Sequence, residues 1–277
     1  MTFVDTGEIY YDGEHLKPAD YFLALRNGRR IVVDVKDPGI DTAAKTTKPL
    51  KISDAERSRL QRFADLYGAE LFIAAYVSVA SMWLLLPIDS FTHQSTNSHT
   101  ITLGDAVAAN EMSILGDLSM GVMAPLRIDV WAELDQPRTI GKDGHAEFTP
   151  GKIILSSGAG PVVTTEDKNI IMFFIQYGHW NLRQDVETIG DQLVRLSMLV
   201  EPLQDDVDQD FHIIGWLSQM YSRLFEGRTQ NDLGVTALDI AVEPGALVSL
   251  IPHDFHSDDL PLWKFEVRPP QIGEGRS

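Results

Sequence analysis

Short apolar segments, each bounded by turn residues, dominate the first 90 residues of the chain. Residues 21–25 and 30–36 are two such segments, and an Asn-Gly pair at 27–28 separates them. This pair is typical of a tight turn between antiparallel strands, so we expect the two segments to be neighbours in a sheet. Residues 71–79 and 82–86 are further apolar runs that predict two more strands.

A helix is predicted between these two pairs of strands. Ser53 and Glu56 have the spacing of a capping box, which satisfies the first free backbone groups of a helix. Apolar residues then recur at helical spacing, and a glycine typical of a helix end follows; they are Leu60, Phe63, Ala64 and Tyr67, before Gly68. The order strand, strand, helix, strand, strand predicts an α/β fold with a mixed sheet.

A polar stretch at residues 89–100 marks the expected domain boundary. We therefore expect one domain over residues 1–90 and a second, of the α+β class, over residues 91–277. In the second domain the pattern predicts helices at 102–115, 184–200 and 211–225, and strands at 128–134, 147–156, 161–164, 170–177, 235–242 and 246–251, with a turn at 157–160.

Charge is distributed unevenly between the two parts. Residues 1–90 hold 11 Lys and Arg against 13 Asp and Glu, whereas residues 91–277 hold 12 against 27. Residues 26–62 are locally basic, with 10 basic and 5 acidic side chains. Because salt screens charges over about 10 Å at 0.1 M, this basic segment can still meet phosphates although the net charge of the chain is −17.

The composition excludes several classes of protein. The chain has no cysteine, which excludes a disulfide framework, a thiolate metal site and a thiol nucleophile. Its longest apolar runs fall far short of the roughly 20 residues that a membrane-spanning helix needs. We therefore expect no membrane segment and a cytoplasmic location.

Asp20, Asp34 and Lys36 are the candidate catalytic residues. Asp34 lies inside an apolar run, where a carboxylate is costly unless it is paired or bound to a metal ion. Lys36 follows two residues later and so shares its face of the strand, and the predicted pairing brings Asp20 close to both. The two carboxylates and the Val35 carbonyl are hard oxygen ligands of the kind that Mg²⁺ prefers, while Lys36 can point at a water or a phosphate.

These residues carry a resemblance to a known family. Pro18-Ala19-Asp20, followed by Asp34-Val35-Lys36, resembles the PD-(D/E)xK signature of the restriction-endonuclease-like nuclease superfamily. The stretch RLQRFADLYGAELFIA at 59–74, followed by Met-Trp-Leu at 82–84, is similar to the archaeal Holliday junction resolvase branch. The resemblance covers roughly residues 8–87.

The resemblance implies a restriction-endonuclease-like fold and a metal-dependent DNA endonuclease, using Mg²⁺ or alternatively Mn²⁺. Asp20 and Asp34 correspond to the metal ligands of the family, and Lys36 to its catalytic lysine. The family also has an N-terminal helix glutamate at the metal site, for which Glu8 and Glu14 are the nearest substitutes here. A homodimer is compatible with this resemblance.

Five basic residues are candidate contacts to DNA phosphates: Arg57, Arg59 and Arg62 on the predicted helix, and Lys45 and Lys48 in the loop before it. The alternative for the arginines is an ordinary solvated helix face.

Two alternatives for the whole chain stay open. The first is a nuclease fold without activity that serves as a binding or assembly module. The second is an acidic protein in which Asp34 pairs with an arginine such as Arg30, Lys36 is a solvated strand end, and the second part mediates protein contacts.

Overall fold

The computed structural model describes residues 2–5, 15–94, 97–203, 209–231, 234–235, 251–252 and 254–269. The chain forms two compact units, Met1–Leu118 with Glu266–Ser277, and Ser119–Phe265. The boundary expected near residue 90 therefore falls inside the first unit. The reason is strand pairing, because β7 (Thr92–Gln94) and β8 (Ser98–Ile101) form a small antiparallel sheet with β4 (Leu50–Ser53).

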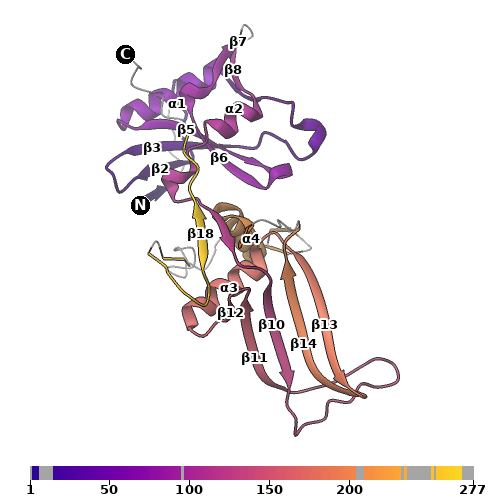
Figure 1. Cartoon of the computed structure of the whole chain (residues 1–277). Helices are drawn as coiled ribbons and strands as arrows, with labels where there is room; N and C mark the ends of the chain where they lie inside the picture. Colours follow the sequence, from indigo (N-terminus) through magenta and orange to yellow (C-terminus); the bar gives the residue numbers. More distant parts are fainter. Residues whose placement is uncertain are drawn as a thin grey trace. The chain divides into compact units, whose positions relative to one another are not determined.

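The first unit is built on a five-stranded mixed sheet (Figure 1). Its order is β1 (Thr2–Asp5), β2 (Tyr21–Ala24), β3 (Arg30–Lys36), β5 (Glu70–Val77) and β6 (Met82–Pro87). The predicted pairing of β2 with β3 is confirmed, and Gly28 takes the positive φ of 85° that the turn between them requires. β3 and β5 are parallel, as the helix between them demands.

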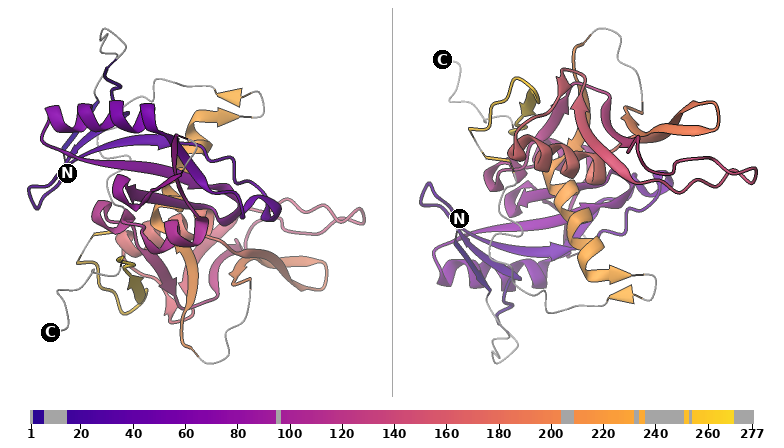
Figure 2. Two further views of the ribbon diagram at one scale, coloured as in Figure 1. Left: turned by 90° about the horizontal axis from the view of Figure 1, so that it is seen from above. Right: turned by 90° about the horizontal axis from the view of Figure 1, so that it is seen from below.

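Helix α1 (Asp54–Leu66) is that connection, and it confirms the predicted helix. Ser53 is its N-cap and accepts a hydrogen bond from the Glu56 backbone N–H. Leu60, Phe63 and Ala64 are buried in one hydrophobic cluster with residues of the sheet. Figure 2 shows α1 lying along one face of the strands.

Shorter elements complete the first unit. Part of the helix expected at 102–115 is present as α2 (Leu103–Ala108), and a separate 3-10 turn, η4 (Met112–Leu115), packs on the sheet face opposite α1. The remaining 3-10 turns are η1 (Ala43–Lys45), η2 (Ser78–Ala80) and η3 (Ile88–Ser90).

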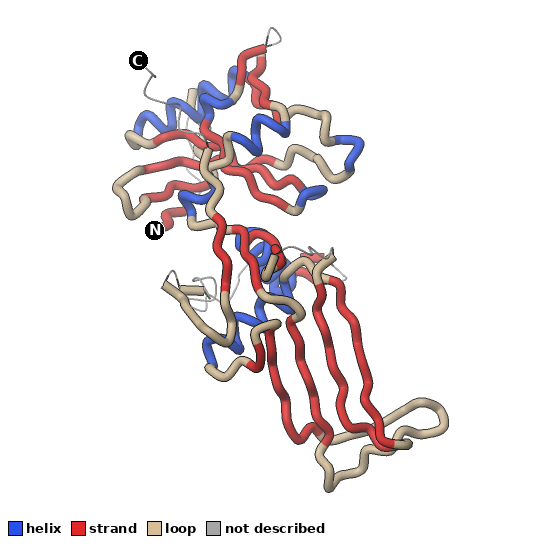
Figure 3. Tube along the Cα trace, in the orientation of Figure 1, coloured by secondary structure: helices blue, strands red, loops and turns tan. Residues whose placement is uncertain are grey.

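The second unit has a five-stranded antiparallel sheet (Figure 3). Its order is β12 (Gly160–Pro161), β11 (Pro150–Ser157), β10 (Leu126–Ala132), β14 (Gln192–Glu201) and β13 (Asn181–Ile189). A three-stranded sheet of β15 (His212–Trp216), β9 (Ser119–Val122) and β18 (Leu262–Phe265), a short pair of β16 (Gln230–Asn231) and β17 (Gly234–Val235), and helices α3 (Thr165–Tyr177) and α4 (Leu217–Thr229) accompany it.

Two predictions for the second unit assign the wrong type of element. Residues 184–200 form the β13–β14 hairpin and not a helix, because Gly190, at φ 64°, turns the chain back in the middle of the segment. Residues 170–177 form the second half of α3 and not a strand, since Thr164 caps a helix whose buried residues recur at helical spacing.

The other predictions are largely met. Strands β10 and β11 and the turn at 157–160 lie close to where the pattern placed them. The strand expected at 161–164 is formed only at Pro161, because the chain then leads into the Thr164 cap of α3. The helix expected at 211–225 begins later, after strand β15. Most of the two strands expected at 235–251 lies outside the described residues.

The buried face of α1 should contribute to the free energy of unfolding of the first unit. Phe63→Ala removes a side chain with 0% exposure and should lower the free energy of unfolding of the first unit by about 3–5 kcal/mol. Leu66→Ala, on the same helix but 64% exposed, is the matched control and should cost less than about 0.5 kcal/mol. Urea unfolding monitored by circular dichroism measures both, and equal effects would contradict the assigned helix face.

Candidate active site

Asp34 is a buried carboxylate near the end of a central strand. Its residue is 1% exposed, and alternation along β3 places it on the same face as Val32, which packs in the cluster under α1. An ionised carboxylate at such a position requires partners that restore the lost hydration. The surroundings of Asp34 therefore decide what this part of the sheet can do.

Two lysines supply these partners. The Lys36 Nζ atom lies 2.6 Å from Asp34 Oδ2, and the Lys17 Nζ atom lies 3.1 Å from Asp34 Oδ1. The prediction that Asp34 and Lys36 share a strand face is thus confirmed by direct contact. Asp34 pairs with lysines and not with the arginine of the second alternative, and Lys36 is only partly exposed.

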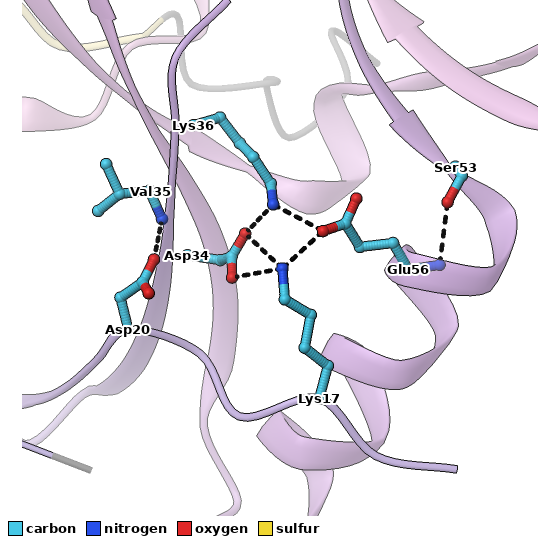
Figure 4. Close-up of polar contacts among 7 residues, drawn as sticks. All are labelled: Lys17, Asp20, Asp34, Val35, Lys36, Ser53 and Glu56. Atoms are coloured by element: carbon cyan, nitrogen blue, oxygen red, sulfur yellow. Dashed lines mark hydrogen bonds and ion pairs between the residues drawn. The ribbon is translucent and has the colours of Figure 1, made fainter. Parts of the chain in front are cut away.

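Glu56 completes the group from the first turn of α1. Its Oε1 atom lies 2.5 Å from Lys17 Nζ and 2.6 Å from Lys36 Nζ. Figure 4 shows the four side chains converging, and we call them the lysine–carboxylate cluster. The serine half of the predicted capping box is formed, but the Glu56 carboxylate is directed to the lysines.

The cluster is neutral as a whole, since two ammonium groups face two carboxylates. Burial lowers the pKa of Lys36, but hydrogen bonds with Asp34 and Glu56 outweigh it, so this pKa lies above its ordinary value of 10.5. Burial likewise raises the pKa of Glu56, and the two lysines outweigh it, so this pKa lies below 4.5. Lys36 is therefore a protonated hydrogen-bond donor at neutral pH, and Glu56 is ionised.

The segment before β2 is tied to α1, which positions Lys17. The Lys17 backbone N–H donates to the Arg59 carbonyl at 3.4 Å, and Arg62 Nη1 donates to the His15 carbonyl at 2.7 Å. Sequence reasoning missed Lys17 as a site residue. The signal available for it was weak, a lysine directly before the proline of the Pro-Ala-Asp motif.

Asp20 takes a different position from Asp34. It is exposed, and its Oδ2 atom accepts a hydrogen bond of 2.6 Å from the Val35 backbone N–H (Figure 4). Because the N–H and C=O of one residue point to the same side of a strand, the Val35 carbonyl faces this side as well. The predicted ligands Asp20 and Val35 are thus neighbours, whereas Asp34 faces α1.

The donor atoms are of the type that binds Mg²⁺. Lys36 Nζ is 2.6 Å from an oxygen of Asp34 and from one of Glu56, so these two oxygens are separated by at most twice that distance. Carboxylates this close match the chemistry of a hard divalent cation. Within the described ranges, however, no three His, Asp or Glu side chains are already grouped as a metal site. An ion would have to compete with the ammonium groups for Asp34 and Glu56.

The predicted phosphate contacts fall into separate places. Arg57 pairs with Asp89 at 3.1 Å, while Arg59 and Arg62 line a hollow of about 540 Å³ on the side of α1 where His15 lies. In the loop before α1, Lys45 pairs with Asp41 at 2.8 Å and Lys48 donates to the Pro38 carbonyl at 3.3 Å. Glu8 and Glu14 lie outside the described residues.

Comparisons with known proteins add little to this geometry. No protein-family model matches the chain, and no curated protein sequence matches it. Among solved structures, the chain is similar to Hjc, a Holliday junction resolvase from the archaeal hyperthermophile Archaeoglobus fulgidus. The identity is 18%, the match covers 41% of this chain and 84% of that one, and the TM-score is 0.33.

A TM-score this low does not establish a shared fold. The function therefore has to be inferred from the residues of the site. Among the described helices, none has both the length and the apolar character that crossing a bilayer requires.

Glu56→Gln should make the free energy of unfolding depend less on pH in the acid range. The lowered pKa of Glu56 adds stability that is fully present above pH 4.5 and is lost as the pH falls through the lower pKa of the folded state. The wild type should therefore exceed the variant in free energy of unfolding at neutral pH, with a gap that closes on acidification. Urea unfolding over a pH series measures this gap.

The matched control is Asp65→Asn, which removes an exposed carboxylate from the same helix. It should leave the acid side of the profile almost as it is in the wild type. If the difference in free energy of unfolding between the wild type and Glu56→Gln stays constant down to the acid transition, the assigned ion pairs are contradicted.

Proposed function

We propose that this protein is a metal-dependent nuclease that hydrolyses phosphodiester bonds in DNA, with the lysine–carboxylate cluster as its active centre. The observation that carries the proposal is Asp34, 1% exposed, held between two lysines and facing a glutamate across them. Burying the Asp34 carboxylate beside three partly exposed charged groups is costly, and a purely structural core would be served as well by an apolar side chain. Carboxylates next to ammonium groups match the needs of phosphodiester cleavage.

Asp34 and Glu56 are the residues that would hold Mg²⁺ or Mn²⁺. Asp20 and the Val35 carbonyl, the other expected ligands, lie next to each other on the side of β3 that faces away from this pair. When bound, such an ion stabilises charge on the phosphate and lowers the pKa of a coordinated water. Asp34 contributes a carboxylate fixed by the sheet, and Glu56 one fixed by the first turn of α1. Both residues belong to regular elements, β3 and α1, which suits a site that must hold its ligands closely.

Lys36 and Lys17 would donate hydrogen bonds to the phosphate. Lys36 has a raised pKa, so it remains protonated and serves as a donor and a positive charge, not as a base, while Asp34 and Glu56 surround it. Its place beside the carboxylates allows it to stabilise negative charge that develops on phosphate oxygens. Lys17 adds a second donor from the opposite side.

Arg59 and Arg62 extend this positive surface along α1. Arg59 is linked to the Lys17 backbone and shares its hollow with Arg62, so a DNA strand that places a phosphate at the cluster could meet these arginines with a neighbouring phosphate. Arg57 is engaged with Asp89 and is the weaker candidate. Lys45 and Lys48 remain candidates for more distant phosphates.

One observation favours a second candidate function, a DNA-binding module without nuclease activity. Both carboxylates of the cluster are neutralised by lysines within the chain, which is also how a nuclease fold without a metal site would satisfy them. Such a protein would bind DNA as an assembly module and leave it uncut.

Cleavage assays separate the two functions. Wild type and the variants Asp34→Asn and Lys36→Ala are incubated with duplex, branched and single-stranded DNA, with Mg²⁺, with Mn²⁺ and with a chelator. We expect metal-dependent cleavage by the wild type and a loss of roughly 10²–10³ in rate for each variant. Asp41→Asn, which removes an exposed carboxylate paired to Lys45 in the same unit, is the control and should cleave normally.

Binding measurements complete the design. DNA binding without cleavage by the wild type under every condition would favour the assembly module. Cleavage that survives both Asp34→Asn and Lys36→Ala would show that the activity lies elsewhere in the chain.

A further inference from the structure

Strand β13 is an exposed edge of the sheet in the second unit. It follows β14 at the end of the strand order (Figure 1). All nine of its residues are exposed. Three of them are large and apolar: Leu182 at 62%, Val186 at 58% and Ile189 at 71%. Within the part of the chain that the structure describes, no strand pairs with its outer edge. A long strand edge whose backbone groups are unpaired is a template for pairing with another strand.

The other edge of the same sheet is protected. There, the two-residue strand β12 covers only the end of β11, and the uncovered part of β11 begins with Pro150, Gly151 and Lys152, the residue types that discourage a further strand. The sequence of β13, Asn-Leu-Arg-Gln-Asp-Val-Glu-Thr-Ile, contains no proline, glycine or lysine. The contrast between the two edges indicates that β13 has a partner.

The order of residues in β13 is self-complementary about Gln184. If two copies of β13 pair antiparallel with the two Gln184 residues opposite each other, Leu182 of each copy lies opposite Val186 of the other. Arg183 then lies opposite Asp185, twice, on the other face. Apolar and opposite-charge pairs at directly opposite positions stabilise a sheet. Within one chain Arg183 pairs with Asp185 at 3.3 Å and with Glu201 at 3.4 Å. The Arg183 and Asp185 side chains are still 55% and 50% exposed, so a second copy can reach them.

The other nearby registers are worse. Centring the pair on Arg183 places two arginines opposite each other, and centring it on Asp185 places two aspartates there, which destabilises a sheet. The β13–β14 pairing is regular from Asn181 to Glu187 and shifts after Glu187. Gln184 is the middle of this regular stretch, so the self-complementary centre coincides with the geometric one.

We infer that two copies of this chain associate through β13, in antiparallel register about Gln184, to form one continuous sheet. The interface is isologous, as expected for a two-fold symmetric dimer. It involves only the second unit, so it does not depend on the nuclease activity proposed above. The partner of the acidic second part is thus a second copy of the chain.

The absence of cysteine from the chain allows a direct test with single-cysteine variants of the full-length protein. In Gln184→Cys, the introduced thiols of two copies face each other at the roughly 4.5–5.5 Å Cα separation of opposite residues, which a disulfide can span. In the control Glu187→Cys, the thiols lie about six residues, or roughly 20 Å, apart. Under mild oxidation we expect a covalent dimer from the first variant, and monomer from the second on a non-reducing gel.

A charge exchange tests the same register without a cross-link. Sedimentation velocity of the wild type over about 1 µM to 100 µM should show a monomer–dimer equilibrium. Arg183→Asp places acids opposite each other and should raise the dissociation constant at least about tenfold. The double variant Arg183→Asp, Asp185→Arg restores opposite charges and should recover dimerisation.

Three outcomes would overturn the inference: a wild type that stays monomeric over the whole range, equal cross-linking at positions 184 and 187, or a dimer that tolerates Arg183→Asp. Circular dichroism of each variant confirms that a lost dimer is not a lost fold.

Discussion

The burial of one carboxylate organises the first unit. Asp34 is 1% exposed in a strand whose neighbours are apolar, and such a group persists only with charged partners within reach. Two lysines contact Asp34 directly: Lys36 from the same strand and Lys17 from the segment before β2. Glu56, which belongs to α1, lies behind Lys17 and Lys36 and pairs with them. Each element has to lie close to the strand end for the charges to be satisfied. The cluster is therefore both a constraint on the fold and a concentration of reactive groups.

The topology of the sheet makes this convergence possible. A parallel pair, β3 and β5, needs a crossover connection, and α1 provides it. The crossover begins beyond the end of β3, so the first turn of α1 lies near the residues that end this strand. The antiparallel hairpin of β2 and β3 brings Asp20 to the same end. Helix packing through Phe63 and backbone contacts with the Lys17 segment then fix both sides of the cluster.

The sequence predicted the local parts of this arrangement well. The Asn-Gly turn, the serine cap of α1 and the shared face of Asp34 and Lys36 follow from short-range rules, and the structure confirms them. Glu56 was found as a capping residue, but its contact with two lysines depends on how α1 sits on the sheet, which no local pattern encodes. Lys17 depends on the same packing.

The errors in the second unit have a related origin. The segment from Gln184 to Val200 has apolar residues that fit either period over short windows, and Gly190 alone signals the turn that makes it a hairpin. Residues 170–177 are apolar enough for a buried strand, and the cap at Thr164 falls in a short segment, 161–164, whose apolar residues favour a strand. The domain boundary depends on β8, which pairs with β4 and carries β7 on its other side. The contact joins segments more than 40 residues apart, such as Ser53 with Ser98, and a polar composition does not reveal it.

The central claim is that the lysine–carboxylate cluster is a metal-dependent catalytic centre. A crystal structure with Mn²⁺ and uncleaved DNA tests it most directly, because anomalous scattering locates the ion independently of the side chains. The account predicts an ion coordinated by Asp34 and Glu56 at about 2.1–2.2 Å, with Lys36 released towards a phosphate oxygen. DNA bound beside an unchanged cluster, with no ion at either carboxylate, would contradict it.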